Sequence, residues 1–152
     1  MARVKLVLPR DFLFAVDIRV RISDINYGNH LGNDAILSLV HEARLQFLNA
    51  HGFSELDIGG RGLMLTDAVI VYKSQGFHGD VLTIRVAVAE FNKYGCDFFY
   101  KIDRQDNGRE IARAKTGMVF FDYATQKIVS VPEVFTDTFQ AKHSSGERSI
   151  DD

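Results

Sequence analysis

The sequence contains no tryptophan and only one cysteine, Cys96. A single cysteine cannot form a disulfide within one chain, and disulfides are the usual support of small secreted domains. The N-terminal residues 1–5 also lack the long apolar region of a secretory signal peptide. Together, these absences favour a protein that resides in the reducing cytoplasm.

Long apolar runs and an excess of basic charge are also absent. Charged residues interrupt the apolar runs before any reaches the roughly 20 residues that a helix needs to span a bilayer, so we expect no membrane partner. The 18 basic residues are outnumbered by 20 acidic ones, and the sequence pI is near 6.2. Because there is no basic stripe to contact phosphates, we expect no nucleic acid partner either.

The length and composition are those of one ordinary globular domain. With 152 residues, of which 46% are hydrophobic, the chain is long enough to bury a core of normal size. Only the end of the chain, where Ser, Gly and charged residues dominate, has the low hydrophobicity of a disordered segment. We therefore expect a single domain at 1–140 and a flexible polar tail at 141–152.

The hydrophobic pattern changes its period early in the chain. Apolar and polar residues alternate from Phe14 to Ile22, which predicts a strand with one buried face. From 34 to 50 the apolar residues recur at helical spacing instead, which predicts an amphipathic helix. Asn33 is a suitable N-cap for this helix, and Gly52 is a suitable stop.

The remainder of the chain is rich in strand patterns. Asp106-Asn107-Gly108 separates two of them and predicts a hairpin with a type I′ turn, because Asn-Gly adopts the positive φ angles that this turn needs. The sheet is therefore expected to be antiparallel. The predicted strands are 63–73, 81–91, 96–103, 110–122 and a short piece at 128–131.

The order of these elements predicts the fold. One long helix that is apolar over much of its surface needs a broad cover, and a curved antiparallel sheet of about five strands wrapped around it provides that cover. This is the hot-dog fold, of the α+β class. Such a sheet leaves edge strands unpaired, which favours association into a homodimer or a homotetramer.

Polar residues gather in the loop that joins the first strand to the helix. Residues 23–33 contain Asp, Asn, Gly and His side chains and lead directly into the helix N-terminus. The free amides and the dipole at a helix N-terminus favour a developing negative charge. We therefore expect the functional site in this loop.

The same loop and the helix after it carry a family pattern. The run from Arg21 to Asn33, with His41-Glu42-Ala43-Arg44 on the helix, resembles the signature of the 4-hydroxybenzoyl-CoA thioesterase-like hot-dog family, D-x-D-x-x-G-H-V-N-N followed by E-A-R. The likeness covers roughly residues 14 to 140. The matching residues are Asp24, His30, Asn33, Glu42, Ala43 and Arg44. The resemblance implies hydrolysis of acyl thioesters of CoA or of acyl-carrier protein.

The chain departs from this family at one position that matters for mechanism. Asn26 occupies the second acidic position of the motif, which in many members is the aspartate that acts as nucleophile or general base. An amide cannot accept a proton or form an acyl intermediate at useful rates. Some related acyl-carrier thioesterases use Asn and His instead, and Asn26 with His30 is suited to that chemistry.

Four residues are candidates for catalysis, each with a structural alternative. Asn26 either positions water or the carbonyl, or closes an Asx-turn. His30 either activates water or serves only as a hydrogen-bond partner. Asp24 is the nearest carboxylate, but it also lies where a turn needs an acceptor. Glu42 either faces a site shared across a dimer or organises a polar network with Arg44.

A second set is expected to bind substrate. The amides near Gly32 and Asn33 are candidates for binding the oxyanion, with helix capping by Asn33 as the alternative. Tyr27 and Thr66 are expected to line the acyl pocket, and Gly28 lies in the same loop.

Neither a metal nor a cofactor is predicted. The histidines show no metal-ligand spacing with acids or with Cys96. Gly59-Gly60-Arg61-Gly62 precedes a strand and lacks the Lys-Ser/Thr of a phosphate-binding loop. Two functions other than hydrolysis remain open: a non-catalytic acyl-thioester binding protein, and a hot-dog hydratase or dehydratase. Hot-dog hydratases carry the pattern D-x-N-x-x-H. Asp24 and Asn26 fit its first part, but His30 lies one residue too late for its histidine.

Overall fold

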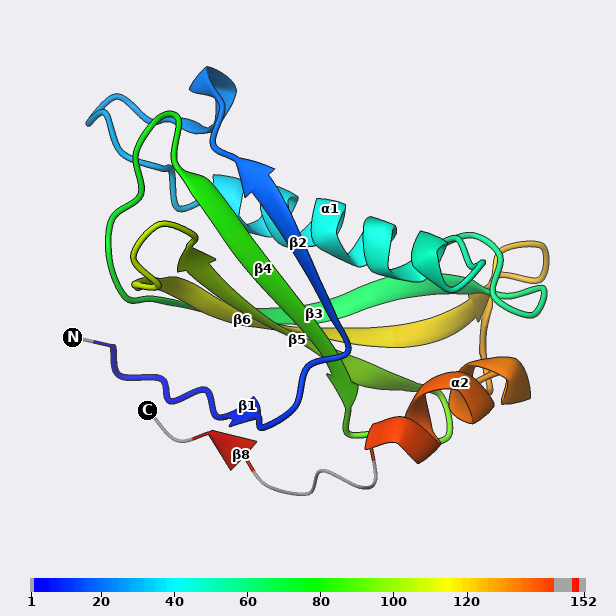
Figure 1. The fold of residues 1–152 in the computed structure, drawn as a ribbon. Helices are drawn as coiled ribbons and strands as arrows, with labels where there is room; N and C mark the ends of the chain where they lie inside the picture. Colours follow the sequence, from blue (N-terminus) through cyan, green and yellow to red (C-terminus); the bar gives the residue numbers. More distant parts are fainter. Residues whose placement is uncertain (1, 144–148, 151–152) are drawn as a thin grey trace.

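A computed structural model describes residues 2–143 and 149–150 of the chain (Figure 1). Of the tail expected at 141–152, residues up to 143 belong to the end of a helix, and residues 149–150 form a short strand. The other residues of that tail lie outside the described part of the chain.

One antiparallel sheet of six strands forms the body of the molecule, as expected from the sequence. The strands are β2 (Phe14–Arg19), β3 (Gly62–Tyr72), β4 (Val81–Ala89), β5 (Gly95–Arg104), β6 (Glu110–Asp122) and β7 (Lys127–Val129). They lie in the order β2-β4-β5-β6-β3, and β7 pairs with the C-terminal end of β6. The strand β3 is an edge strand and carries a bulge between Leu65 and Asp67.

The long helix α1 (Ala35–Ala50) lies across one face of this sheet (Figure 1). Its buried side is apolar apart from Arg44, and Val40, Ala43 and Phe47 are completely buried. These side chains join inward-facing residues of β4 and β5, such as Ile84 and Phe98, in the main hydrophobic core. The predicted hot-dog fold, with one helix wrapped by a curved sheet, is therefore confirmed.

A second helix, α2 (Glu133–His143), closes one end of the core, where no helix was predicted. Phe135 and Phe139 are fully buried and contact each other with ring centroids 4.8 Å apart. The ring of Phe139 also lies 5.0 Å from that of Phe47 in α1. This helix depends on two phenylalanines in an otherwise polar segment, so its sequence pattern is weak.

The first strand and the long helix differ from prediction at the ends that face the loop. The strand stops at Arg19, and a 3-10 helix, η1 (Ile22–Asp24), follows. Ile22 is 72% exposed, so it does not continue the buried face. The helix begins at Ala35 with Asp34 at the N-cap position and no side-chain cap, so the predicted capping role of Asn33 is wrong.

The hairpin between β5 and β6 is confirmed, but its predicted turn type is wrong. Gly108 has a φ of 71°, whereas Asn107 is not among the residues with positive φ. A type I′ turn needs positive φ at both central residues. The loop instead closes through a hydrogen bond from the Gly108 amide to the Arg104 carbonyl at 2.8 Å, so only the glycine has to adopt the left-handed conformation.

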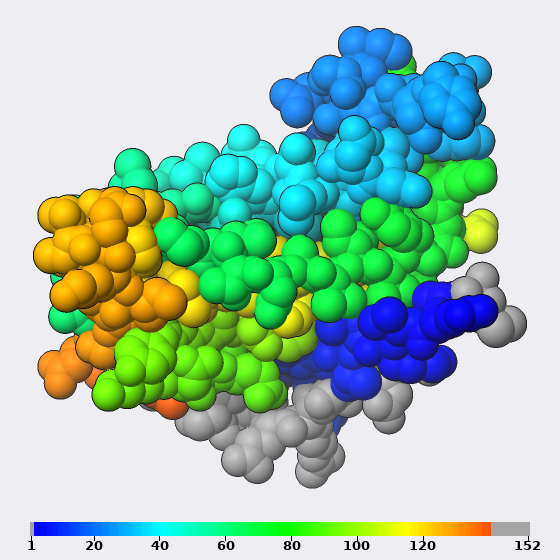
Figure 2. Space-filling model, turned by 180° about the vertical axis from the view of Figure 1, so that it is seen from behind, coloured from blue at the N-terminus to red at the C-terminus, as the bar shows by residue number. Residues whose placement is uncertain are grey.

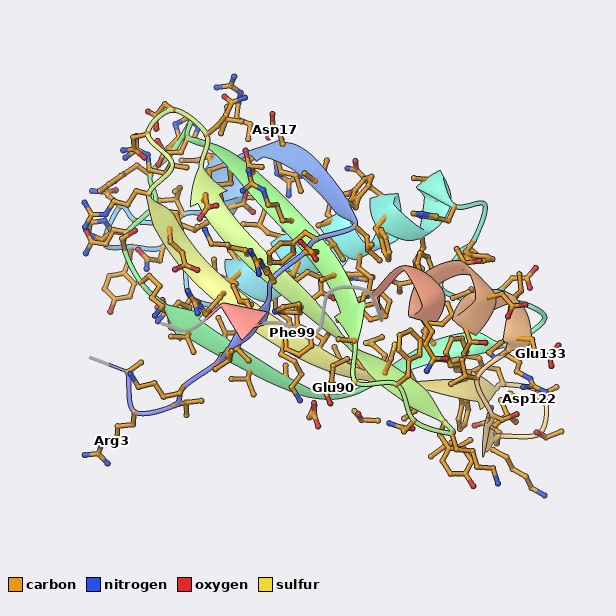
Figure 3. The ribbon with its side chains drawn as sticks, turned by 60° about the horizontal axis from the view of Figure 1, so that its bottom comes forward. Arg3, Asp17, Glu90, Phe99, Asp122 and Glu133 are labelled. Atoms are coloured by element: carbon orange, nitrogen blue, oxygen red, sulfur yellow. The ribbon has the colours of Figure 1, made fainter. Side chains whose placement is uncertain are left out.

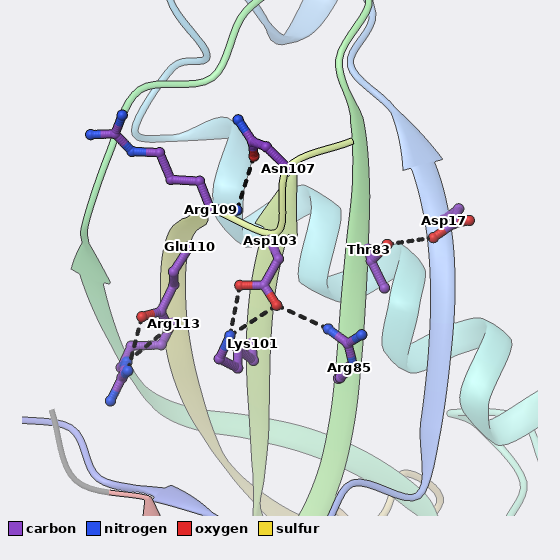
Figure 4. Close-up of polar contacts among 9 residues, drawn as sticks. All are labelled: Asp17, Thr83, Arg85, Lys101, Asp103, Asn107, Arg109, Glu110 and Arg113. Carbon is purple, nitrogen blue, oxygen red and sulfur yellow. Dashed lines mark hydrogen bonds and ion pairs between the residues drawn. The ribbon is translucent and has the colours of Figure 1, made fainter. Parts of the chain in front are cut away.

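The outer face of the sheet, opposite α1, is covered by the N-terminal segment and by ion pairs. Strand β1 (Leu8–Pro9) pairs with β8 (Ser149–Ile150), and Leu8 packs with Phe99 in a second hydrophobic cluster (Figure 3). Beyond this cluster, Asp103 receives hydrogen bonds from Arg85 at 2.9 Å and from Lys101 at 2.8 Å (Figure 4). The outer face is therefore occupied by other parts of the chain, and α1 packs only on the inner face.

Candidate active site

The loop 23–33 folds back on itself at the start of α1. The Asn26 amide donates to the His30 carbonyl at 2.9 Å, and the Gly32 amide donates to the Asp24 carbonyl at 2.9 Å. The Leu31 amide donates to the Gly76 carbonyl at 2.8 Å, which ties the loop to the segment after β3. These bonds bring polar side chains that are close in sequence to one place in space.

A hollow of about 310 Å³ opens beside this loop. Three residues of the predicted site line it together, namely Asn26, His30 and Asn33. The opposite wall comes from the end of β3 and the residues after it, 72–76, and from Ile111 in β6. None of these wall residues was predicted from the sequence to belong to the site, although Tyr72 and Lys73 lie within the region of family likeness.

Asn26 uses its amide oxygen to hold the loop. Its Oδ1 accepts hydrogen bonds from the Gly28 amide at 2.9 Å and from the His30 amide at 3.3 Å. This is the Asx-turn that was the structural alternative for this residue. Because both partners are N–H donors, the amide oxygen must face them, so Nδ2 is the Asn26 atom left to donate to a ligand.

His30 presents a ring nitrogen without a partner. Its Nδ1 is buried and has no hydrogen-bond partner within the described part of the chain. The ring packs edge-on against Phe77, with centroids 5.3 Å apart. A buried polar atom without a partner is costly, and such atoms are expected where a substrate or a water molecule supplies the missing bond.

The helix start offers main-chain amides without partners close to these side chains. The Gly32 amide is already bonded to the Asp24 carbonyl, so it does not face a ligand. The Asn33 and Asp34 amides have no hydrogen-bond partner among the described residues, and the Asn33 carbonyl accepts from the Tyr72 hydroxyl at 3.1 Å. Of these two residues, Asn33 lines the hollow, so its amide suits the role of oxyanion donor.

Six residues of the predicted site do not line this hollow in the single chain, namely Asp24, Tyr27, Gly28, Gly32, Glu42 and Thr66. Asp24 is 6% exposed, and its carboxylate accepts from the Arg21 amide at 2.9 Å, which stabilises η1. Glu42 is exposed on α1 and accepts from Gln46 at 2.9 Å. Tyr27 is fully exposed, and the Thr66 hydroxyl donates to the Gly117 carbonyl at 3.1 Å.

A polar network around Arg44 lies beneath α1, but it does not include Glu42, which the sequence suggested as a partner. Arg44 donates from Nε to Glu55 at 3.0 Å and from Nη1 to the Tyr100 hydroxyl at 3.0 Å. That hydroxyl lies 2.8 Å from the hydroxyl of Thr116. Burial alone would lower the pKa of Arg44, but Tyr100 and Glu55 outweigh it and raise that pKa above its usual value. Arg44 therefore stays cationic.

This network reaches a second hollow, of about 270 Å³, because Arg44 lines it. Its lining residues come from one flank of α1 and from the adjacent edge strand β3, which lie side by side across the face in Figure 2. They are Asp34, Leu37, Ser38, His41, Arg44 and Leu65. The two hollows share no lining residue, although Asn33 of the first and Asp34 of the second are neighbours in the sequence.

No three His, Cys, Asp or Glu side chains in the described ranges gather closely enough to hold a metal ion. No helix in this part of the protein is long and apolar enough to cross a membrane.

Solved structures with the same fold are numerous, although their sequences are distant. A 1,4-dihydroxy-2-naphthoyl-CoA thioesterase from Synechocystis superposes with a TM-score of 0.77 and 21% identity, covering 84% of this chain and 95% of that one. A Staphylococcus aureus protein in complex with CoA superposes with a TM-score of 0.77 and 20% identity, covering 99% of this chain and 91% of that one. For a thioesterase superfamily protein from Jannaschia the TM-score is 0.79 and the identity 17%, covering 93% of this chain and 95% of that one.

The comparison of sequences is more decisive for family membership. No curated protein matches the chain. Residues 20–139, however, match the Thioesterase-like superfamily. This match includes the loop, α1 and the strands β3 to β7, and it agrees with the observed fold. The chain therefore belongs to the thioesterase-like superfamily and has its hot-dog fold.

Proposed function

We propose that the protein hydrolyses acyl thioesters of CoA to the free acid and the thiol. The observation that carries this proposal is the hollow where Asn26, His30 and the free Asn33 amide meet at the start of α1. Two neighbours of the same fold support CoA as the carrier, since one is a CoA thioesterase and another is in complex with CoA. Acyl-carrier protein is the other possible thiol carrier.

In the proposed reaction, the thioester carbonyl oxygen lies between the Asn33 amide and Nδ2 of Asn26. Both are donors, and the dipole of α1 adds to their effect as negative charge develops on this oxygen. The imidazole of His30 takes a proton from a water molecule as the water oxygen bonds to the carbonyl carbon. The tetrahedral intermediate then collapses, the carbon–sulfur bond breaks, and the leaving thiolate receives the proton from His30.

Direct attack by water follows from the identity of residue 26. Asn26 cannot form the acyl intermediate that an aspartate forms in many relatives. Asp24 is the nearest carboxylate, but its contact with the Arg21 amide turns it away from the hollow. In this proposal Asp24 supports the loop, and His30 is the only general base.

A homodimer or a homotetramer is part of the proposal. The edge strand β3 has unpaired main-chain groups, and Leu65 on it is 41% exposed. Tyr27 is fully exposed at the tip of the catalytic loop. Pairing of two copies would cover these groups, and it would let Tyr27, Thr66 or Glu42 contribute to the site of the neighbouring copy. We also propose a cytoplasmic location, without membrane or nucleic acid partners.

One observation favours a second function, namely acyl-thioester binding without hydrolysis. The Asn26 amide replaces a catalytic acid, and its oxygen is committed to the loop. A protein that had lost its catalytic acid would keep the hollow and bind thioesters without cleaving them.

The decisive experiment is a panel of acyl-CoA and acyl-carrier-protein thioesters in which released thiol is titrated. The proposed function predicts thiol release with at least one CoA thioester, and a strong decrease in His30→Ala. The matched control is His78→Ala, because His78 is an exposed histidine outside the hollow. Binding of these thioesters without any thiol release would instead support the second function. A hydratase would change the acyl chain and leave the thioester intact.

A further inference from the structure

Strand β6 carries a bulge where it borders the first hollow. Two consecutive residues of β5, Ile102 and Asp103, pair with Ala112 and Glu110 of β6, which makes Ile111 the extra residue on β6. A bulge bends its strand and can aim a side chain toward an active site. Ile111 is buried and lines the hollow. The shape of this wall therefore depends on how the bulge is held.

The bulge binds the wall segment 72–76 through three hydrogen bonds. The Ile111 carbonyl accepts from the Lys73 amide at 2.8 Å and from the Ser74 amide at 3.1 Å. The Glu110 carbonyl accepts from the Ser74 hydroxyl at 2.6 Å. The position of the wall segment is therefore set by the first residues of β6.

The wall segment also fits closely against the catalytic loop. The Gly76 carbonyl accepts from the Leu31 amide at 2.8 Å. A Cβ atom at Gly76 would lie only 3.1 Å from the Leu31 side chain, so there is no spare room between the two segments. A shift of the bulge would therefore change the width of the hollow between the wall and the loop.

An ion pair spans this bulge on the outer face of the sheet. In a regular strand, residues three apart point to opposite faces. Because Ile111 and Ala112 both belong to the inner core, Glu110 and Arg113 both reach the outer face (Figure 4). The Arg113 guanidinium donates to the two Glu110 carboxylate oxygens at 3.0 and 2.9 Å. Such a two-point contact fixes direction as well as distance.

Arg113 is itself held from a third side. It is 4% exposed and donates to the Leu6 carbonyl of the N-terminal segment at 3.0 Å. A buried ion pair adds little net stability, because the loss of hydration offsets the attraction between the charges. A fixed geometry is what this pair supplies, and the geometry that it fixes is that of the bulge.

We infer that Arg113 is a positioning residue for the proposed reaction: with Glu110 it fixes the bulge at Ile111 and so holds the wall segment 72–76 in place. This inference rests on the proposed function and adds a pair of residues that act from the outer face of the sheet. The wall segment carries none of the reacting groups of the proposed mechanism. Its displacement should therefore weaken substrate binding more than it slows the chemical step.

The first test separates substrate binding from chemistry. Arg113→Met/Glu110→Gln removes both charges, so that neither is left buried and unpaired. With the best CoA thioester of the panel, kcat/KM should fall about tenfold, mostly through a rise in KM. Arg85→Met/Asp103→Asn is the matched control, because this pair, 2.9 Å apart, lies on the same face and does not span the bulge. An equal rise of KM in the control, or a fall of kcat alone, would overturn the inference.

The second test needs no ligand. Hydrogen exchange followed by NMR reports the local opening of single main-chain hydrogen bonds. The amides that hold the wall belong to Leu31, Lys73 and Ser74, and in the double variant they should exchange about tenfold faster or more. The Phe120 amide, which donates to the Tyr94 carbonyl near the other end of β6, should be unchanged. Equal acceleration at all four amides would show a merely structural role and overturn the inference.

The two tests also distinguish this inference from the proposed function. If the wild-type protein hydrolyses no thioester but the three wall amides alone lose protection, the proposed function fails and the positioning of the wall holds. If thioesters are hydrolysed with the same KM in both double variants, the inference fails and the proposed function stands. If the double variant does not fold, Arg113→Lys and its control Arg85→Lys give the same comparison, since lysine keeps the charge but lacks the two-point contact.

Discussion

The Tyr72 hydroxyl donates a hydrogen bond to the main-chain oxygen of Asn33 at 3.1 Å. This bond ties the end of the edge strand β3 to the residue whose amide is the proposed oxyanion donor. The two residues are far apart in the chain, and the contact joins the two walls of the first hollow.

Tyr72→Phe should therefore reduce the rate more than it reduces stability. Loss of the bond should lower kcat by about tenfold or less and the free energy of unfolding by less than about 1.5 kcal/mol, since Tyr72 is partly exposed. Steady-state kinetics and urea unfolding measure the two effects. Tyr123→Phe is the matched control, because the Tyr123 hydroxyl donates to the Leu63 carbonyl at 3.0 Å near the opposite end of β3. An equal fall of kcat in both variants would contradict a role for Tyr72 in the site.

His30→Ala should decrease kcat about 10²- to 10⁴-fold, the usual effect of removing a general base. The thiol-release assay measures this decrease, and circular dichroism shows whether the variant is folded. If this variant kept the full rate with its fold intact, Asp24 or Glu42 would become the candidate base.

Asn26→Asp should raise the rate, because a carboxylate at this position is a stronger base than an amide and still accepts from the Gly28 and His30 amides. Asn26→Ala should lower it, because the Asx-turn and the Nδ2 donor are both lost. The thiol-release assay measures both variants. Asn92→Asp is the matched control, because the Asn92 side-chain oxygen also accepts from two nearby amides, those of Tyr94 and Gly95, in the turn after β4. A gain of rate in Asn92→Asp would show that the effect is not local to the site.

Asp67 in the bulge of β3 should make a small, pH-dependent contribution to stability. The hydrogen bond from Lys115 at 2.8 Å lowers the pKa of this carboxyl below its usual value. Because the pKa is lower in the folded state, the stabilisation is present above the unfolded-state pKa and is lost as the pH falls through the folded-state pKa. Asp67 is exposed, so we expect Asp67→Asn to cost less than about 1 kcal/mol at neutral pH.

Urea unfolding of Asp67→Asn and the wild-type protein at neutral pH and near pH 2 checks this expectation. The difference in free energy of unfolding should disappear in acid, where both side chains are uncharged. A difference that stays the same at both pH values would assign the effect to the hydrogen bond with the Gly117 amide instead of to charge.

The fold was predictable wherever the hydrophobic period was long and regular. The predicted helix 34–50 differs from α1 by one residue, and the predicted strand 110–122 has the bounds of β6. Helix α2 was missed, because its burial depends on Phe135 and Phe139 in a short and mostly polar segment. Their contact with Phe47, which is distant in sequence, makes this segment a helix.

The candidate site was only half predictable for a related reason. Asn26, His30 and Asn33 are close in sequence and carry the family pattern, so they could be found together. The wall formed by residues 72–76 and Ile111 comes from other elements, and no local pattern marks it. The exposed position of Tyr27 and the inward contact of Asp24 with Arg21 were also decided by the local fold of the loop.

The sequence by itself determined the strand and helix periods, the polar loop and the family, because these depend on residues that are near one another in the chain. The tertiary structure alone decided which donors remain free. Arg44, Glu55 and Tyr100 meet beneath α1 only after the sheet has curved around it, and His30 keeps a ring nitrogen without a partner only because of where the loop folds. A free donor is what remains after all other partners are paired, so it depends on contacts over the whole fold.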